Sequence, residues 1–258
     1  EIMKTETLFN TDELMNSLFS TSSKQKLLAF SSLIIMFIVF SIASPNFATF
    51  SNIVGILIST AVTGILATGV TFIIITGGID LSVGTVMTFG SVMTGVFISY
   101  WGFPIYIGIL GGLGAGALAG FVNGTLTAKL GIPSFIATLG MMMVAKGLNL
   151  VISGTKPIYF LSTPEFRKIA MGKVFGIPYG VLIFLGATLI ASFILTKTVF
   201  GRYTYALGSN EEAARLSGIN VDRWKIAVFT LGGFFSGLAG VIMASRLNSA
   251  QPALGQGY

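Results

Sequence analysis

The chain has 258 residues, of which 53% are apolar and only 9% are charged, and its formal net charge is +6. This composition excludes an ordinary soluble domain, in which about a quarter of the residues are charged. The small, dispersed positive charge also argues against a nucleic-acid-binding protein. Because cysteine and histidine are absent, disulfides, thiolate or imidazole metal sites and Ser-His or Cys-His nucleophiles are excluded. We expect no catalytic residue and no bound metal.

The apolar runs predict an all-α integral membrane protein, a polytopic bundle of about seven transmembrane helices. Each run is about twenty residues long, which is the length that a helix needs to cross a bilayer, and none shows the alternation of a barrel strand. Residues 1–26 are polar and are interpreted as an N-terminal cytosolic arm, and residues 27–258 as the membrane domain. The predicted spans are 27–44, 53–75, 82–101, 105–128, 133–152, 179–196 and 226–244.

Turn signals and polar stretches separate these spans. Ser44-Pro45-Asn46 is a turn signal that ends the first span. Two longer polar stretches, 153–178 and 197–225, are interpreted as loops on opposite sides of the membrane. Residues 251–258 form neither a charged tail nor a capped helix end, so we expect the membrane domain to be C-terminally incomplete and the sequence to be a piece of a longer protein.

The distribution of basic residues indicates an N-terminus in the cytosol. With this orientation nine of the fifteen lysines and arginines face the cytosol, as the positive-inside rule favours. These nine are Lys4, Lys24, Lys26, Lys129, Lys197, Arg202, Arg215, Arg223 and Lys225. The 197–225 loop is then cytosolic.

A short polar helix is predicted inside the 197–225 loop. Ser209 and Glu212 have the spacing of a capping box, Gly208 before them is able to break the chain, and Gly218 fits a left-handed closing position. The first turn would carry Glu211 and Glu212, where the helix dipole favours carboxylates. A helix too polar for lipid and flanked by apolar spans is suited to contact a cytosolic partner.

A line of glycines is predicted to pack the helices closely. The span at 105–128 has five glycines, each four residues apart, which form one slowly winding groove without side chains. They are Gly108, Gly112, Gly116, Gly120 and Gly124. The span at 226–244 also has small residues at four-residue spacing, at positions 232, 236, 240 and 244. Such a face serves static packing or a sliding surface during gating.

The break between the second and third spans contains an acidic residue. Asp80 follows Gly77 and Gly78, which allow the backbone to turn, and precedes Ser82. A carboxylate at a membrane-embedded break is a functional candidate, although Asp80 or Ser82 could simply cap the third span.

Other polar residues in the spans are candidates for lining a passage for a hydroxylated solute. Asn123 is the first of these, and each is as well suited to bond a neighbouring helix. The others are Asn149, Thr60, Thr63, Thr68 and Thr71. Lys146 either extends to the headgroups or faces a polar passage.

Nucleotide binding by this chain is not indicated. The Gly-Thr-Lys sequence at 154–156 lacks the upstream glycine and the following Ser or Thr of a phosphate-binding loop, and Pro157 follows it. We therefore expect no cofactor on this chain, with ATP and magnesium bound by a partner subunit.

Four sequence blocks resemble the branched-chain amino acid and sugar permease family of bacterial ATP-binding cassette (ABC) importers. The resemblance covers residues 44–258, and the N-terminal arm adds nothing to it. The blocks are TGGIDLSVG (76–84), FIATLGMM (135–142), GRYTYALGSNEEAARLSGINV (201–221) and RLNSAQPALGQGY (246–258).

The resemblance implies a function for the polar helix. In the family this loop is the coupling segment, a short helix that docks into a cleft of the ATPase. The residues carried over to this role are Gly208, Ser209, Asn210, Glu211, Glu212, Ala213, Ala214, Arg215 and Gly218.

The resemblance also implies partners and a substrate class. A second permease subunit in a homodimer, a tandem-domain ATPase and an extracytoplasmic sugar-binding protein are expected, in a bacterial or archaeal plasma membrane. The implied substrate is a monosaccharide, with ribose first and xylose, galactose or a furanose-like signalling molecule as alternatives.

Two other classes of membrane protein fit the sequence less well. An ion-coupled secondary carrier would need embedded acidic residues, and Asp80 alone is thin support. An intramembrane protease would need two carboxylates sharing one site or histidine ligands to a metal, and the sequence has neither arrangement.

Overall fold

The computed structural model describes residues 21–258, with side chains from residue 27 onwards. Most of the predicted arm 1–26 therefore lies outside the described residues, but its last six residues belong to helix α2 (Thr21–Ala43). The chain divides into two compact units, one ending at Gly55 and one from Ile56 to Tyr258.

The described part of the first unit contains α2 and the start of α3 (Phe50–Ile75). The helix α2 ends directly before the predicted turn, where the Phe47 N–H donates to the Ser44 carbonyl over 3.1 Å. The ring of Phe47 packs against both Phe37 and Phe40 of α2, with centroid distances of 5.4 Å. The aromatic contacts fix how the chain leaves α2.

The second unit contains the long apolar helices. They are the remainder of α3, α4 (Val83–Gly95) with its π-helical continuation η1 (Val96–Tyr100), α5 (Ile105–Lys129), α6 (Ser134–Ser153), α8 (Tyr179–Lys197) and α11 (Val221–Leu247). Within the described residues six helices are long and apolar enough to cross a membrane, and residues 27–43 form a shorter apolar helix. The prediction of an all-α polytopic membrane bundle is confirmed.

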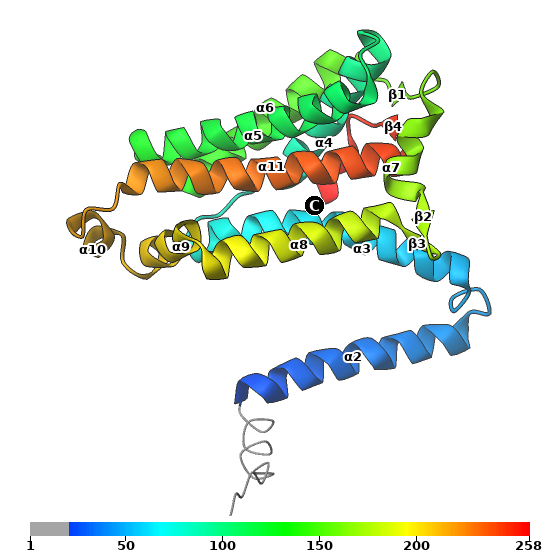
Figure 1. The fold of residues 1–258 in the computed structure, drawn as a ribbon, viewed down its shortest axis with the longest axis horizontal. Helices are drawn as coiled ribbons and strands as arrows, with labels where there is room; N and C mark the ends of the chain where they lie inside the picture. The colour runs from blue at the N-terminus through cyan, green and yellow to red at the C-terminus, as the bar shows by residue number, and fades with distance from the viewer. Residues whose placement is uncertain (1–20) are drawn as a thin grey trace, which may run out of the picture. The chain divides into compact units, whose positions relative to one another are not determined.

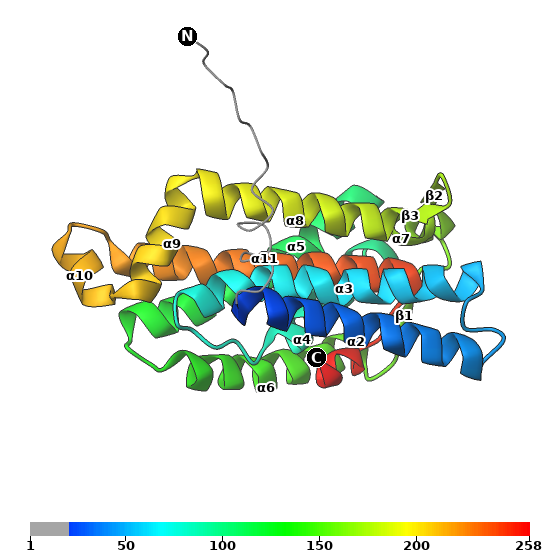
Figure 2. The ribbon, with the colours of Figure 1, turned by 90° about the horizontal axis from the view of Figure 1, so that it is seen from below.

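Helix α11 occupies the middle of the second unit (Figures 1 and 2). It packs on α5 and α4 on one side, and its Phe229 and Phe235 join a buried cluster with α3 residues such as Ile73 on the other. Most of its central residues are buried, as is expected of a helix that is apolar on all sides and surrounded by other helices. A displacement of α11 would therefore move its neighbours.

The prediction that residues 153–178 form a simple polar loop is wrong, because this stretch contains short helices and strands and buried side chains. Its elements are β1 (Ile158–Tyr159), η2 (Pro164–Arg167), α7 (Lys168–Met171), β2 (Lys173–Val174) and β3 (Ile177–Pro178). Phe160 and Phe166 are fully buried, with ring centroids 4.2 Å apart. These two apolar side chains anchor the stretch to the bundle.

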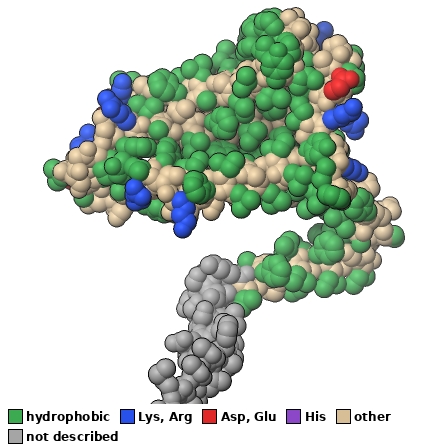
Figure 3. Space-filling view, viewed as in Figure 1, with side chains coloured by type: hydrophobic (Ala, Val, Ile, Leu, Met, Phe, Trp, Pro, Cys, Tyr) green, Lys and Arg blue, Asp and Glu red, His purple; other side chains and the backbone are tan. Residues whose placement is uncertain are grey.

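The C-terminal residues run from this end of the bundle back toward its middle (Figure 1). Strand β4 (Ser249–Ala250) pairs antiparallel with β1, and η3 (Leu254–Gly257) lies against α4. In the space-filling view, apolar side chains cover the middle of the second unit and basic side chains gather at its two ends (Figure 3). This distribution is that of a bundle whose middle faces lipid.

Candidate functional site

Helix α9 (Val199–Ser209) leads from the end of α8 into the predicted coupling region. The prediction that Gly208 breaks the chain is wrong, because α9 continues through it. A Cβ atom at Gly208 would collide with the carbonyl of Ile75, the last residue of α3. The glycine is needed for this close approach between two backbones.

The predicted polar helix exists as α10 (Glu211–Leu216), but its N-cap differs from the prediction. Asn210 is the cap, and its side-chain oxygen accepts a hydrogen bond from the Ala213 N–H over 2.9 Å. The expected capping box of Ser209 and Glu212 is therefore wrong, since Ser209 is the last residue of α9. Asparagine and serine are almost equally good caps, so spacing alone chose one residue too early.

The end of α10 follows the prediction. Gly218 has φ +81°, its N–H bonds to the Arg215 carbonyl, and the Ile219 N–H bonds to the Ala214 carbonyl, both over 3.1 Å. This is the hydrogen-bond pattern of a glycine-terminated helix. Asn220 then caps α11 by accepting from the Arg223 N–H.

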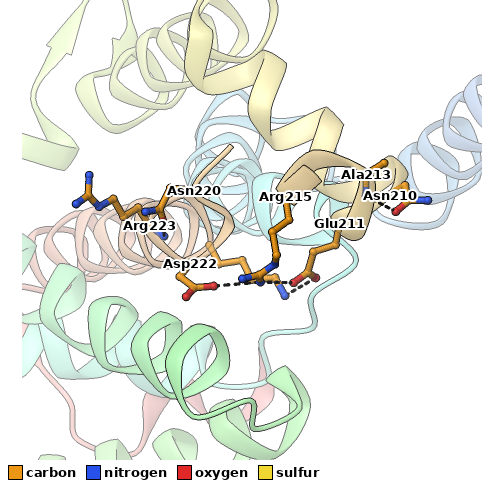
Figure 4. Close-up of polar contacts among 8 residues, drawn as sticks. Asn210, Glu211, Ala213, Arg215, Asn220, Asp222 and Arg223 are labelled. Carbon is orange, nitrogen blue, oxygen red and sulfur yellow. Dashed lines mark hydrogen bonds and ion pairs between the residues drawn. The ribbon is translucent and has the colours of Figure 1, made fainter. Parts of the chain in front are cut away.

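Two ion pairs connect α10 to the start of α11, and a third lies within α10 (Figure 4). Glu211 lies 2.6 Å from the Lys225 amine and 3.6 Å from the Arg215 guanidinium. Arg215 also lies 3.3 Å from Asp222. Glu211 and Arg215 thus extend toward the first turns of α11, whereas Arg223 points away from them (Figure 4).

The opposite face of α10 has no such partners among the described residues. Glu212, Ala213 and Leu216 are exposed, and Leu216 is 85% exposed although it is apolar. Ala214 faces inward and is buried with Leu207 and Val221. The predicted coupling residues therefore divide into an inward set that holds α10 and an outward set that is free for a partner.

A pocket of about 410 Å³ lies beside the ion pairs. Glu211, Arg215 and Lys225 form one wall of it. The turn after α3 (residues 76–78) and the turn between α5 and α6 (residues 127–134) form the others. Three connections that are distant in the sequence therefore meet at the end of the bundle that carries α10.

The break between α3 and α4 is held by a chain of hydrogen bonds. Asp80 accepts from the Ser82 N–H over 2.8 Å and from the Ser82 hydroxyl over 2.6 Å. Asn123 of α5 donates to the Ser82 hydroxyl oxygen over 3.0 Å. Gly77 adopts φ +76° at the start of this segment. Asp80, Ser82 and Asn123, three predicted site residues, thus form one network.

Two hydroxyl groups that sequence reasoning missed also hold this break. Ser134 accepts from the Ile79 N–H over 3.0 Å, and Thr138 accepts from the Leu81 N–H over 3.1 Å. Both belong to α6, and Thr138 is fully buried. Their position near the start of a span that follows a turn was the available signal.

The Asp80 carboxyl lies between the spans Phe50–Ile75 and Val83–Tyr100 and is half-buried. Within the described chain no cation pairs with Asp80. The residue therefore acts on Ser82 as a hydrogen-bond acceptor, for which charge is not required.

The candidate passage residues are spread over several places. Asn123 and Asn149 are buried, and each keeps a side-chain oxygen without a partner in the described structure. Thr68 and Thr71 bond to carbonyls one turn earlier and line a pocket of about 190 Å³ between α3 and α8. Lys146 lines a different pocket of about 150 Å³ near η3. The structure does not bring these residues into one passage.

The five glycines of α5 lie against α4, η1 and α11. A Cβ at Gly116 would lie 2.7 Å from the Gly237 nitrogen, and one at Gly124 would lie 2.7 Å from the Ile226 Cα, both of α11. Cβ atoms at Gly108, Gly112 and Gly120 would collide with Ile98, Thr94 and Phe229 respectively.

On α11, the small residues that meet α5 differ from the predicted line. Gly233 and Gly237 face α5, whereas Gly232 contacts Ile73 of α3 and Gly240 contacts the Met87 carbonyl of α4. Helix α11 is thus lined with small residues on two faces, because it has neighbours on both. Close backbone contact is therefore the general mode of packing around α11.

The described residues contain no group of three or more acidic, histidine or cysteine side chains that could hold a metal ion.

Comparisons with known proteins identify the family. The family model described as "Branched-chain amino acid transport system / permease component" matches residues 52–258. The ribose import permease protein RbsC of Haemophilus influenzae is 41% identical over 233 residues, covering 89% of this chain and 72% of the relative. That of Bacillus subtilis is 42% identical over 236 residues, covering 91% and 73%.

A relative named for another sugar matches almost as well. The L-arabinose transport system permease protein AraH of Escherichia coli is 40% identical over 224 residues, covering 87% of this chain and 68% of the relative. No solved structure gives a significant match. The chain belongs to the branched-chain amino acid transport permease family, whose members are the membrane-embedded permease subunits of ABC importers.

Proposed function

We propose that this chain is the permease subunit of an ABC importer that takes up a monosaccharide, with ribose as the leading substrate. The observation that supports the importer mechanism best is α10, an ion-paired polar helix with an exposed outer face at one end of an apolar bundle. The relatives named for ribose import support the substrate.

The proposed partners follow from the same features. The outer face of α10, formed by Glu212, Ala213 and Leu216, is the surface that we assign to a tandem-domain ATPase in the cytosol. A second copy of the permease would complete the passage, and an extracytoplasmic sugar-binding protein would deliver the substrate. The ATPase would bind ATP and magnesium and hydrolyse the nucleotide.

Alternating access would then depend on α10. Closure of the ATPase pair would displace α10, and α11 would shift against α5 and α4 along their closely packed glycine faces. Binding of sugar shifts the equilibrium between the two states only if its affinity for them differs. Ser209 and Gly208 at the end of α9 would contribute to the position of α10 rather than to the contact surface.

Uptake of radiolabelled ribose by the reconstituted importer tests the function. We expect uptake to require ATP on the side of the vesicle membrane where the ATPase is bound. It should persist when ionophores collapse the membrane potential and the ion gradients. Unlabelled arabinose serves as the competitor, because a relative is named for transport of this sugar. Uptake that needs an ion gradient and not ATP would contradict the proposal and support a secondary carrier.

The docking role of α10 predicts that Glu212→Lys uncouples the importer. A reversed charge on the outer face should reduce ribose import by about tenfold while the permease stays in the membrane at its normal level, because one mismatched charge at an interface costs on the order of 1–3 kcal/mol. Glu165→Lys, an exposed glutamate at the opposite end, is the matched control. Equal import by Glu212→Lys and the control would refute the docking role.

A further inference from the structure

A short link whose own hydrogen bonds end α10 and begin α11 joins the two helices. Residues 217–220 join them, and Gly218 in this link is left-handed, with no described atom within 4 Å of an added Cβ. These bonds lie within the link and at the helix ends, so the contacts between α10 and α11 themselves come from side chains.

Apolar packing holds α10 through Ala214, its one buried side chain, and through Ile219 of the link, which packs against the same cluster. Ala214 is the α10 residue in a small cluster with Leu207 of α9 and Val221 of α11. An alanine offers little contact area compared with a larger apolar side chain. The ion pairs are therefore a substantial part of what orients α10.

Lys225 is the best placed of the paired cations. Its side chain is only 19% exposed, compared with 43% for Glu211, and their 2.6 Å contact is the shortest ion pair in the described chain. The next residue, Ile226, is where α11 touches Gly124 of α5. Lys225 thus connects α10 to the point at which α11 meets its main neighbour.

The pocket of about 410 Å³ beside these residues leaves space for movement. Its walls are the ion pairs and the two turns at residues 76–78 and 127–134. If α10 were free of Lys225, it could tilt into this space without moving α11. An intact ion pair would oblige α11 to follow α10.

We propose that the Glu211–Lys225 ion pair, assisted by Arg215 and Asp222, is a latch that transmits displacement of α10 to α11. Lys225 is in this sense a positioning residue for transport. The inference rests on the proposed function of α10 as the coupling helix. It separates Glu211, which acts inside the permease, from Glu212, which faces the partner.

A charge exchange tests the latch in the assembled importer. Glu211→Lys and Lys225→Glu each place like charges together, and each should lower the ribose imported per ATP hydrolysed by about fivefold, since an exposed or partly exposed pair changes an equilibrium by up to roughly this factor. The double variant restores opposite charges between positions 211 and 225, although position 211 then has the same charge as Arg215, and it should recover to within about twofold of the wild type. A double variant no better than the worse single variant would overturn the latch.

Arg223→Glu is the matched control for Lys225→Glu. It reverses a charge within the same turns of α11, changes the cytosolic charge balance equally, and affects an exposed side chain that points away from Glu211 (Figure 4). We expect its coupling ratio to equal that of the wild type. The pair Glu212→Lys with Lys225→Glu should show no rescue, because Glu212 faces outward.

A spin label separates failure of the latch from failure of the proposed function. This sequence has no cysteine, so Ser217→Cys adds one labelling site at the end of α10, with any cysteine elsewhere in the full permease replaced by serine. In the full permease in lipid, Lys225→Glu should raise the mobility of this label, and the double exchange should lower it again. This readout needs no sugar or ATP. Unchanged mobility in the single variant would overturn the latch whatever the transport assay shows.

Discussion

Asp80 illustrates how one residue can be held for structural reasons at a place that invites a functional interpretation. Its carboxyl group accepts two hydrogen bonds from Ser82, which also receives one from Asn123 of α5. Ser134 and Thr138 of α6 hold the neighbouring backbone N–H groups. The break between α3 and α4 is thus fastened to two further helices.

Substitution of Asp80 distinguishes hydrogen bonding from charge. Asp80→Ala would leave the Ser82 N–H and hydroxyl without their acceptor, at a cost of about 1–3 kcal/mol, and should lower the yield and thermal stability of the purified permease. Asp80→Asn retains a side-chain oxygen that can accept these hydrogen bonds but cannot ionise. We expect its stability and transport to be near those of the wild type.

The comparison of the two Asp80 variants decides the role. A stable Asp80→Asn permease without transport would show that the carboxylate itself takes part in transport. An Asp80→Ala permease with unchanged stability and transport would make the hydrogen bonds dispensable.

At the scale of the element, α5 depends on the absence of side chains along one face. Gly116 faces the backbone of α11, whereas Gly114, two residues away, has no described atom within 4 Å of an added Cβ. Gly116→Ala should therefore force the helices apart, at roughly 1–3 kcal/mol for an overpacked site. Gly114→Ala is the control on the same helix and should leave the melting temperature unchanged. Equal melting temperatures for the two variants would contradict the assigned packing face.

The elements themselves were largely predictable, because hydropathy and turn signals report the length and boundaries of a span directly. The stretch 153–178 was not, since two buried phenylalanines in a polar stretch give no periodic signal. Spacing placed the cap of α10 at Ser209. In the structure α9 continues to Ser209, and Gly208 inside it packs closely against the end of α3. Local sequence does not contain this contact.

At the scale of the whole molecule, the sequence predicts which residues form the candidate site. It does not predict which face of α10 packs against α11 and which face is exposed. Glu211 and Glu212 are equivalent in the sequence, and a step of 100° along α10 sends one to Lys225 and the other to solvent. Which face of α10 meets α11 depends on the angle between two helices. That angle follows from Gly218, Ala214 and the ion pairs together.

Orientation in the membrane is the remaining property of the whole molecule that a direct measurement decides. The bias of basic residues predicts that the end carrying α10 faces the cytosol. Since the chain has no cysteine, single substitutions can report each end: Leu130→Cys in the turn between α5 and α6, and Leu161→Cys after β1, are both exposed. An impermeant maleimide should label Leu161→Cys in intact spheroplasts and Leu130→Cys only after permeabilisation. The reverse pattern would place α10 outside, where no ATPase could reach it, and would remove the basis of the coupling mechanism.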